Sequence, residues 1–306
     1  MKQMDSVKCP PAGGPERMVR FIMESRKQEE GPLLLESERL EPLSRRAGVI
    51  VGPGFSFSTD TVLLAAFSMP SPGEKCAELG TGCGVIPLLW CLRAKPAKIW
   101  AAEIQPEACS MARRSVSYNR MEDRVSIVEG DLKLLAASGK VPRDLDLVAS
   151  NPPYKEDGTG IKSGDERLRI ARHEVACGFA DIAGAAASLL RWGGRFCCCM
   201  RPERLCDTLF VSRNAGLEPK RIRFVQQRKN KAPFLFLLQA AKGGKPGLAV
   251  EPVLFLEAED GGASEEMKAI YGDYREGSPK FGKEIDRTGR IGQAVRRRKD
   301  GCGNER

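Results

Sequence analysis

Histidine is nearly absent from this chain of 306 residues, in which His173 is the only one. Catalysis by a serine–histidine relay, or by a metal bound through several histidines, is therefore not expected. The 11 cysteines show no paired Cys-x-x-Cys spacing, so neither a zinc site nor a disulfide framework is predicted. No apolar run approaches the length of a membrane span, and residues 1–30 are too polar for a signal peptide. We expect a reduced, cytoplasmic protein without a metal or a membrane partner.

Apolar side chains and positive charge, by contrast, are plentiful. Hydrophobic residues make up 42% of the chain, which is enough for a substantial core in one large domain. The net charge of +9 favours a polyanionic partner such as RNA or DNA, although simple solubility explains it as well. We interpret residues 1–37 as a tail and lead-in, residues 38–276 as the folded domain, and residues 277–306 as a basic, disordered tail.

Strand and helix patterns alternate along the folded domain. The expected strands are 75–79, 98–104, 125–129, 145–150, 195–200, 221–227 and 234–241, with an edge strand at 253–257, and the expected helices are 61–67, 85–93, 106–118, 181–191 and 202–214. This alternation predicts an α/β fold with a doubly wound, mostly parallel seven-stranded sheet of Rossmann-like type. The link before the last long strand is too short for a crossover helix, so that strand is expected to be antiparallel.

Three local details complete the expected fold. Thr59 or Asp60 is expected to cap the first helix, and Asp181 the fourth. The run Cys197–Cys199 lies inside an apolar stretch, and successive strand residues point to opposite faces of a sheet. We therefore expect these cysteines to be buried free thiols.

A glycine-rich turn follows the first strand of this sheet. Gly80, Gly82 and Gly84 form a G-x-G-x-G pattern, and missing side chains let a ligand approach the backbone closely. A dinucleotide enzyme would prefer G-x-G-x-x-G, with a pyrophosphate at the helix N-terminus. Glu78 before the turn would repel a diphosphate but attract a cationic amino-acid group. The pattern thus favours S-adenosylmethionine over NAD, while a packed strand–helix turn without a ligand is the alternative.

Acidic residues also close the next two strands. Glu103 lies 19 positions after Gly84, a spacing at which a carboxylate accepts hydrogen bonds from ribose hydroxyls. Asp131 is placed to bind the adenine amine of the cofactor, with Leu132 packing on the ring. Each acid alone is more often a solvated strand end, but acids at three successive strand ends beside a glycine turn indicate a site.

The tetrapeptide Asn151, Pro152, Pro153 and Tyr154 follows the fourth strand, at the sheet edge where ligands bind. Two prolines hold the chain extended, so it forms a stiff lip. We expect the Asn151 side-chain oxygen and the Pro152 carbonyl to accept hydrogen bonds from a planar exocyclic amine. Tyr154 would stack on the base. An ordinary turn after a strand is the alternative.

These motifs together resemble class I S-adenosylmethionine-dependent methyltransferases of the N6-adenine type. More narrowly, the sequence is similar to the bacterial tRNA(Val) adenine-N6 methyltransferase family, which modifies the adenosine beside the anticodon. The matching stretches are 54–65, 78–88, 103–105, 151–154, 171–174, 193–196, 201–204 and 270–272. The resemblance implies that Phe55, Ser58 and Asp60 border the cofactor, with Glu78 and the three glycines at its methionine end, Glu103 at the ribose and Asp131 at the adenine. It also implies that Asn151 and Tyr154 hold the target base.

The substrate is less strongly indicated than the chemistry. Protein-glutamine N5 and guanine-N2 methyltransferases share the general motifs, and a non-catalytic RNA-binding module is a third alternative. An acid-free basic stretch at 220–231 predicts phosphate contacts by Arg223, Arg228 and Lys229, with a solvated sheet end as the competing interpretation. No catalytic role is assigned to His173.

Overall fold

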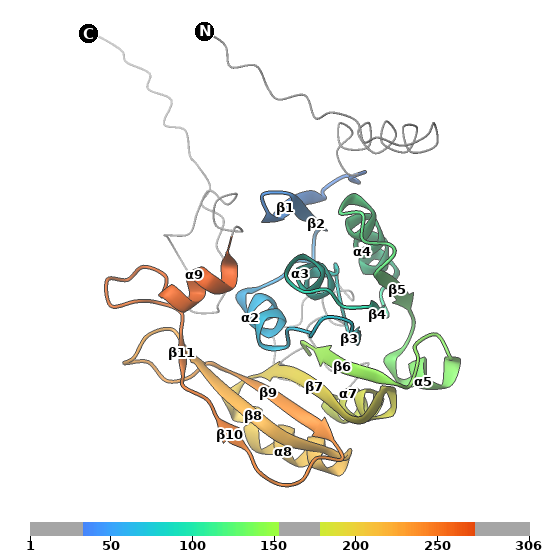
Figure 1. The fold of residues 1–306 in the computed structure, drawn as a ribbon. Coiled ribbons are helices and arrows are strands. Elements are labelled where there is room, and N and C mark those ends of the chain that lie inside the picture. Colours follow the sequence, from blue (N-terminus) through green and yellow to red (C-terminus); the bar gives the residue numbers. More distant parts are fainter. Residues whose placement is uncertain (1–32, 153–177, 273–306) are drawn as a thin grey trace, which may run out of the picture.

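The computed structural model describes residues 33–152 and 178–272. Its centre is a nine-stranded sheet of order β10-β8-β9-β7-β6-β3-β4-β5, with β11 beside β8 (Figure 1). The strands are β3 (Lys75–Leu79), β4 (Lys98–Glu103), β5 (Val125–Glu129), β6 (Leu145–Ser150), β7 (Leu190–Met200), β8 (Leu217–Gln226), β9 (Leu235–Lys242), β10 (Ala249–Val250) and β11 (Leu254–Phe255). Strand β9 is antiparallel to both of its neighbours, and the remaining pairs are parallel. The predicted fold is therefore confirmed, and β10 is a short edge strand that the sequence pattern missed.

Helices cover both faces of this sheet (Figure 1). One face carries α2 (Thr59–Phe67), α3 (Val85–Arg93) and α4 (Pro106–Tyr118), and the other carries α5 (Leu135–Ser138), α7 (Phe179–Leu189) and α8 (Leu205–Asn214). Each face has its own apolar core, because strands covered on both sides bury both sets of side chains. Short 3₁₀ turns, η1 (Leu132–Leu134) and η2 (Pro202–Arg204), lead into α5 and α8.

Two peripheral pieces flank the first helical layer. The hairpin β1 (Arg39–Ser44) and β2 (Ala47–Val51) packs on α4, where Ile50 N–H donates to Ser115 Oγ at 2.9 Å. Helix α9 (Glu265–Tyr271) lies against α2. None of the helices in the described ranges is long and apolar enough to cross a membrane.

The cysteine run behaves as its alternation predicts. Cys197 and Cys199 pack into the core on the α2–α4 side, whereas Cys198 packs into the opposite core. All three are buried thiols that form no disulfide within the described residues. Burial raises the pKa of Cys197 to about 12, so its thiol stays protonated.

Several boundaries differ from the sequence predictions. Helix α2 begins at Thr59 with Ser58 at the N-cap, so neither Thr59 nor Asp60 is the cap. Helix α7 begins at Phe179 with Gly178 at the N-cap, not at Asp181, because Phe179 is buried against Phe196 and draws the first turn into the core.

Strand β7 also starts earlier than predicted. It begins at Leu190 and runs through Gly193 and Gly194, which were expected to end a helix. A Cβ atom at Gly194 would lie 2.9 Å from the Leu145 carbonyl oxygen, and the pairing of β6 with β7 shifts register there. Glycine at this position therefore lets the two strands approach closely instead of stopping an element. Strand β8 begins at Leu217 because residues from there onward pair with β9.

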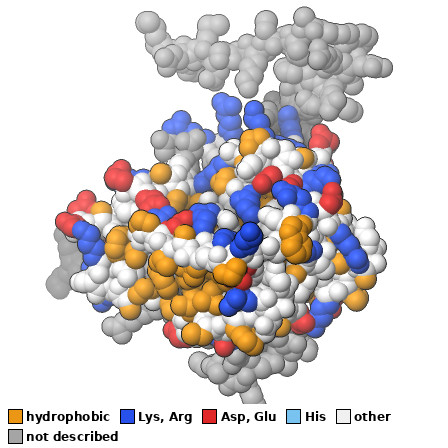
Figure 2. Space-filling model, turned by 60° about the horizontal axis from the view of Figure 1, so that its bottom comes forward, with side chains coloured by type: hydrophobic (Ala, Val, Ile, Leu, Met, Phe, Trp, Pro, Cys, Tyr) orange, Lys and Arg blue, Asp and Glu red, His pale blue; other side chains and the backbone are white. Residues whose placement is uncertain are grey.

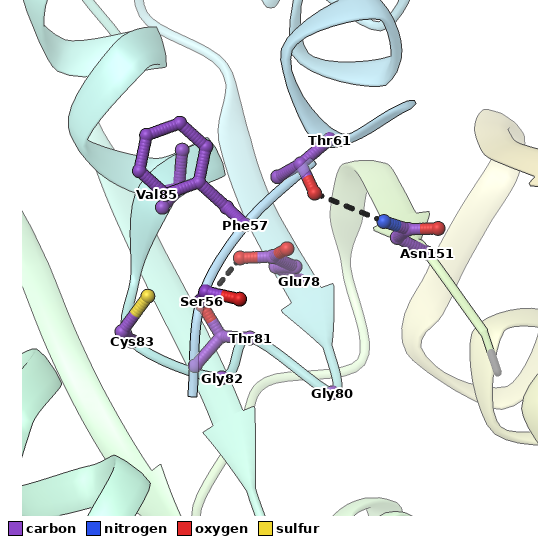
Figure 3. Close-up of a pocket in the computed structure, with 10 residues that line it drawn as sticks. All are labelled: Ser56, Phe57, Thr61, Glu78, Gly80, Thr81, Gly82, Cys83, Val85 and Asn151. Atoms are coloured by element: carbon purple, nitrogen blue, oxygen red, sulfur yellow. Dashed lines mark hydrogen bonds between the residues drawn. The ribbon is translucent and has the colours of Figure 1, made fainter. Parts of the chain in front are cut away.

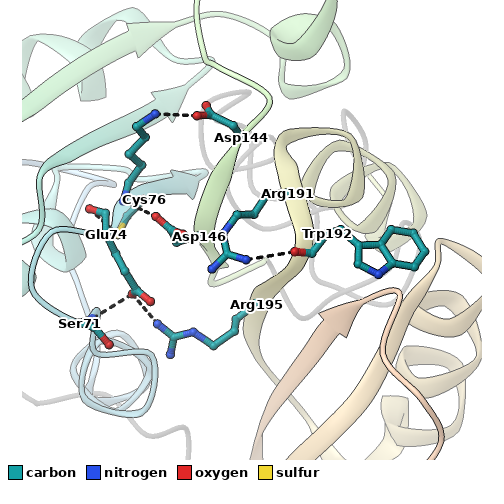
Figure 4. Close-up of polar contacts among 9 residues, drawn as sticks. Ser71, Glu74, Cys76, Asp144, Asp146, Arg191, Trp192 and Arg195 are labelled. Atoms are coloured by element: carbon teal, nitrogen blue, oxygen red, sulfur yellow. Dashed lines mark hydrogen bonds and ion pairs between the residues drawn. The ribbon is translucent and has the colours of Figure 1, made fainter.

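A network of ion pairs and hydrogen bonds connects neighbouring strands near the sheet edge opposite the glycine turn (Figure 4). Arg195 of β7 bonds the Glu74 carboxylate at 2.5 Å, and Glu74 also accepts the Ser71 backbone N–H at 2.9 Å. Asp146 of β6 accepts the Lys75 backbone N–H at 2.8 Å. These contacts bind the loop before β3 to β6 and β7.

The contribution of this network to stability is testable. Replacing Arg195 by Met is expected to lower the free energy of unfolding by ~1–3 kcal/mol, because Glu74 then loses its partner in a mostly buried position. Urea denaturation measures the loss. The control is Lys75→Met, whose exposed pair with Asp144 lies in the same network and is expected to matter little. Equal losses in both variants would contradict the importance of burial.

Candidate active site

Strand pairing brings the glycine turn and the Asn-Pro lip together. Strand β3 pairs with β6 so that Leu79 lies opposite Ser150, and Ser150 Oγ donates to the Leu79 carbonyl at 2.8 Å. Gly80 and Asn151 therefore leave the same sheet edge from neighbouring strands. A pocket of about 160 Å³ opens between them, lined by the turn, by Asn151, by Ser56 and Phe57 from the segment before α2, and by Thr61 in the first turn of α2 (Figure 3).

The three glycines of the turn have different roles. Gly80 and Gly82 have φ values of 76° and 55°, and a Cβ atom on either would meet nothing within 4 Å. Both face open space, as the interpretation of a ligand-binding turn requires. Gly84, with φ of 89°, would place a Cβ atom 3.3 Å from Ala112 Cβ of α4. Its missing side chain thus serves close packing between the turn and α4.

Glu78 is an acidic residue that is almost completely buried. Its side chain lines the pocket although the residue is only 2% exposed, and it accepts a hydrogen bond from Thr81 Oγ1. Burial raises the pKa of Glu78 to about 8; the Thr81 hydrogen bond opposes this shift, and the nearby Glu103 adds to it. A cationic ligand group in the pocket would lower this pKa again, because an opposite charge favours the ionised carboxylate.

Glu103 is held by backbone amides around the turn. Its Oε2 accepts Gly82 N–H at 2.9 Å, and its Oε1 accepts Ile104 N–H at 2.8 Å and Gln105 N–H at 3.0 Å. The carboxylate thereby connects the turn after β3 to the start of α4. Ile104 beside it is 44% exposed, a large apolar side chain at the site edge to which the sequence analysis gave no role.

Asp131 follows the end of the next strand, β5. It caps η1, where its Oδ1 accepts Lys133 N–H at 2.9 Å, and the partly buried Leu132 packs against the core beyond it. The carboxyl ends of β3, β4 and β5 thus carry the acids in the predicted order along one sheet edge. Binding of ribose by Glu103 and of adenine by Asp131 and Leu132 stays a prediction.

The Asn151 side chain is held at both of its ends. Its Nδ2 donates to Thr61 Oγ1 at 3.1 Å, and its Oδ1 accepts the Cys199 thiol at 3.1 Å. Pro152 after it is buried. Pro153, Tyr154 and His173 lie outside the described residues, so stacking of a base on Tyr154 stays a prediction.

The segment before α2 contributes other residues than those predicted. Ser56, Phe57 and Thr61 line the pocket, and both Phe55 and Phe57 pack against the core. Ser58 takes the N-cap position of α2. Asp60 is buried and lies 3.9 Å from Arg201 Nη2. Contact of Phe55, Ser58 and Asp60 with a cofactor therefore stays a prediction. No local pattern separates Phe57 from Phe55, because residues two positions apart share one side of an extended segment.

The basic stretch on β8 faces acidic side chains of the segment that follows β9. Arg223 bonds Glu266 through both Nη atoms at 2.6 and 2.8 Å, Arg228 bonds Glu257 at 2.9 Å, and Lys229 bonds Glu259 at 2.7 Å. These ion pairs connect the cations to α9 and to the segment that follows β11. Contact with phosphates stays a prediction, and it requires the pairs to open. In the ranges that the structure describes, no group of His, Cys, Asp or Glu could hold a metal ion.

The buried acid predicts a pH dependence of stability. Glu78 ionises at 4.5 in its ordinary state and at about 8 in the folded protein, so unfolding releases a proton between these values. Wild-type stability is then lost as pH rises, by up to ~1.4 kcal/mol per pH unit from this group. Glu78→Gln keeps an acceptor for Thr81 but cannot ionise. The stability of the wild type relative to this variant is expected to fall between about pH 5 and pH 8 in urea titrations; a constant difference would contradict the raised pKa.

Comparisons with known proteins agree with this geometry. Residues 47–174 match the family described as Methyltransferase small domain. The chain is 28% identical over 187 residues to the tRNA1(Val) (adenine(37)-N6)-methyltransferase of Porphyromonas gingivalis, covering 60% of this chain and 72% of that protein. It is 25% identical over 225 residues to the protein of the same name from Shewanella sp. (strain MR-4), covering 72% and 92%.

Solved structures show the same architecture. A predicted O-methyltransferase from Agrobacterium tumefaciens matches with a TM-score of 0.57 at 20% sequence identity, over 71% of this chain and 97% of that chain. At this identity the likeness concerns the fold. The family match and the named relatives lead to one conclusion: the chain is an S-adenosylmethionine-dependent methyltransferase, in which residues 47–174 are similar to the methyltransferase small domain.

Proposed function

We propose that this enzyme methylates the exocyclic N6 of an adenine in RNA, with the adenosine beside the anticodon of valine tRNA as its target. The observation that carries the proposal is the position of Asn151, whose amide lines the same pocket as Glu78 and the glycine turn. An acceptor for a planar amine thus lies beside the expected methyl donor. The curated relatives, named for methylation of adenine 37 in tRNA1(Val), support RNA as the substrate.

The residues of the pocket fit S-adenosylmethionine. Gly80 and Gly82 leave space in front of the turn, and Glu78 offers a buried acid to the cationic amino-acid group. The pocket of about 160 Å³ is smaller than the ~300–1,000 Å³ of typical small-molecule sites, so it suits the methionine end. Glu103 and Asp131 at the neighbouring strand ends would hold the nucleoside. When bound, the cofactor supplies a methyl group on sulfonium.

The chain's own contribution to the reaction is orientation of the amine. The lone pair of the adenine N6 is delocalised into the ring, which makes this nitrogen a poor nucleophile. Hydrogen bonds from the amine to Asn151 Oδ1 and to the Pro152 carbonyl would favour a pyramidal nitrogen. Its lone pair is then directed towards the methyl group. Positioning and electrostatics supply most of the catalysis in such a transfer, and no strong base is needed.

RNA contacts are proposed for the loop that follows β8. Strand β8 runs parallel to β7, because β9 is antiparallel to both, so this loop leaves the sheet at the same edge as Asn151. It carries Arg228 and Lys229. On the face shown in Figure 2, lysine and arginine side chains form several groups separated by acidic and uncharged ones. Phosphate binding here would therefore be local, at the rim of the site.

Removal of the Asn151 amide tests the proposed chemistry. In Asn151→Ala, the transition state loses a hydrogen bond to the reacting nitrogen, and kcat is expected to fall by at least ~10²-fold. Cofactor affinity, measured by calorimetry, is expected to survive. The control Asn214→Ala removes an amide at the exposed end of α8 and should leave kcat unchanged. Full activity of Asn151→Ala with tRNA would refute the role of the lip.

Charge removal tests the RNA surface. Arg228→Gln and Lys229→Gln are each expected to weaken RNA binding and to reduce the slope of log K against log salt concentration by ~1. Arg191→Gln, at the opposite sheet edge, is the matched control. If affinity and slope stay unchanged while thermal stability falls, the pairs with Glu257 and Glu259 have a structural role only.

A further inference from the structure

We infer that Thr61 is a positioning residue of this site: its hydroxyl holds the Asn151 amide in place, so that the amide oxygen stays available to the target amine. The consequence for catalysis rests on the proposed function. The contact itself rests on the pocket geometry, in which Thr61 Oγ1 accepts Asn151 Nδ2–H at 3.1 Å (Figure 3).

An asparagine amide needs such a partner in order to act as an acceptor. Its oxygen accepts and its NH₂ group donates, and the terminal torsion that exchanges them is soft and roughly two-fold. An exocyclic amine is a hydrogen-bond donor, so an inverted Asn151 would present a second donor to it. A threonine hydroxyl can donate as well as accept, but in the structure Thr61 Oγ1 accepts Nδ2–H, which leaves Oδ1 for an incoming donor. With Nδ2 held by Thr61, Oδ1 lies on the opposite side of the amide (Figure 3).

Cys199 complements this arrangement from strand β7. Its thiol lies 3.1 Å from Asn151 Oδ1 and donates to it. A thiol is a weak donor, so this contact is consistent with an oxygen at that end without competing strongly for it. Thr61 and Cys199 thus recognise opposite ends of the same amide, and the hydroxyl is the stronger hydrogen-bonding group of the two.

Thr61 can perform this role because the first turn of α2 is anchored on either side. Thr59 Oγ1 accepts the hydroxyl of Tyr271 from α9 at 3.3 Å, and Tyr271 is buried. Asp60 lies 3.9 Å from Arg201, which follows the end of β7. Consecutive residues of one helical turn thereby contact α9, β7 and Asn151. The position of the Thr61 hydroxyl is fixed by the fold before any substrate binds, which is the condition for preorganised catalysis.

The test compares Thr61→Val with Thr61→Ser. Valine keeps the shape but removes the acceptor, and kcat with tRNA is expected to fall about two- to tenfold, the value of one neutral hydrogen bond. KM is expected to change little, and Thr61→Ser should restore kcat. The control Thr208→Val removes a buried helical hydroxyl, which bonds the Arg204 carbonyl, and should lower stability without this loss of kcat. Wild-type kcat in Thr61→Val would overturn the inference.

A second measurement is independent of the substrate. The side-chain amide protons of Asn151 are identified in nitrogen-15 NMR spectra by their absence from Asn151→Ala. They are expected to shift in Thr61→Val and to return in Thr61→Ser; resonances that do not move in Thr61→Val would overturn the inference. If the wild type labels no RNA but the shift is present, the proposed function fails and the Thr61 contact stands, with kcat then measured on whichever substrate accepts the methyl group.

Discussion

The pairing of β3 with β6 is the constraint on which the site depends. It places Leu79 opposite Ser150, so the turn that follows one strand and the lip that follows the other begin side by side. The two strands are parallel, so their carboxyl ends meet at one edge of the sheet. The connecting helices return the chain to the opposite edge each time. The ion network at the opposite edge holds the same strands at their starts. A shift in this register would separate Glu78 from Asn151.

Next to this strand pair, the site combines a buried acid, Glu78, with an amide of fixed position, Asn151. Glu78 is buried enough for its pKa to rise, yet it lines the pocket, so a cationic ligand would find a partner screened little by water. Asn151 is fixed differently, through direct contacts with α2 and β7. The backbone amides that hold Glu103 connect the turn to α4. The acids expected to bind the cofactor and the amide expected to orient the target amine therefore follow different strands of one sheet.

Local patterns in the sequence were sufficient for the sheet, the glycine turn and the acids at the strand ends. They failed where a contact links distant segments. Thr61 is 90 positions from Asn151, and Cys199 is 48 positions away, so neither contact has a local signature. The acidic partners of the basic run were missed because they lie in a later segment, with Lys229 and Glu259 30 positions apart. Gly194 was taken as a helix end because its close contact with Leu145 comes from strand packing.

The central claim is that the lip at Asn151 presents an adenine amine of RNA to the methyl donor. The most direct test incubates the enzyme with labelled S-adenosylmethionine and either transfer RNA or total protein, followed by mass spectrometry of the nucleosides and peptides. The account predicts label in N6-methyladenosine from the transfer RNA. Label in N2-methylguanosine, or in a glutamine side chain of a protein, would contradict it.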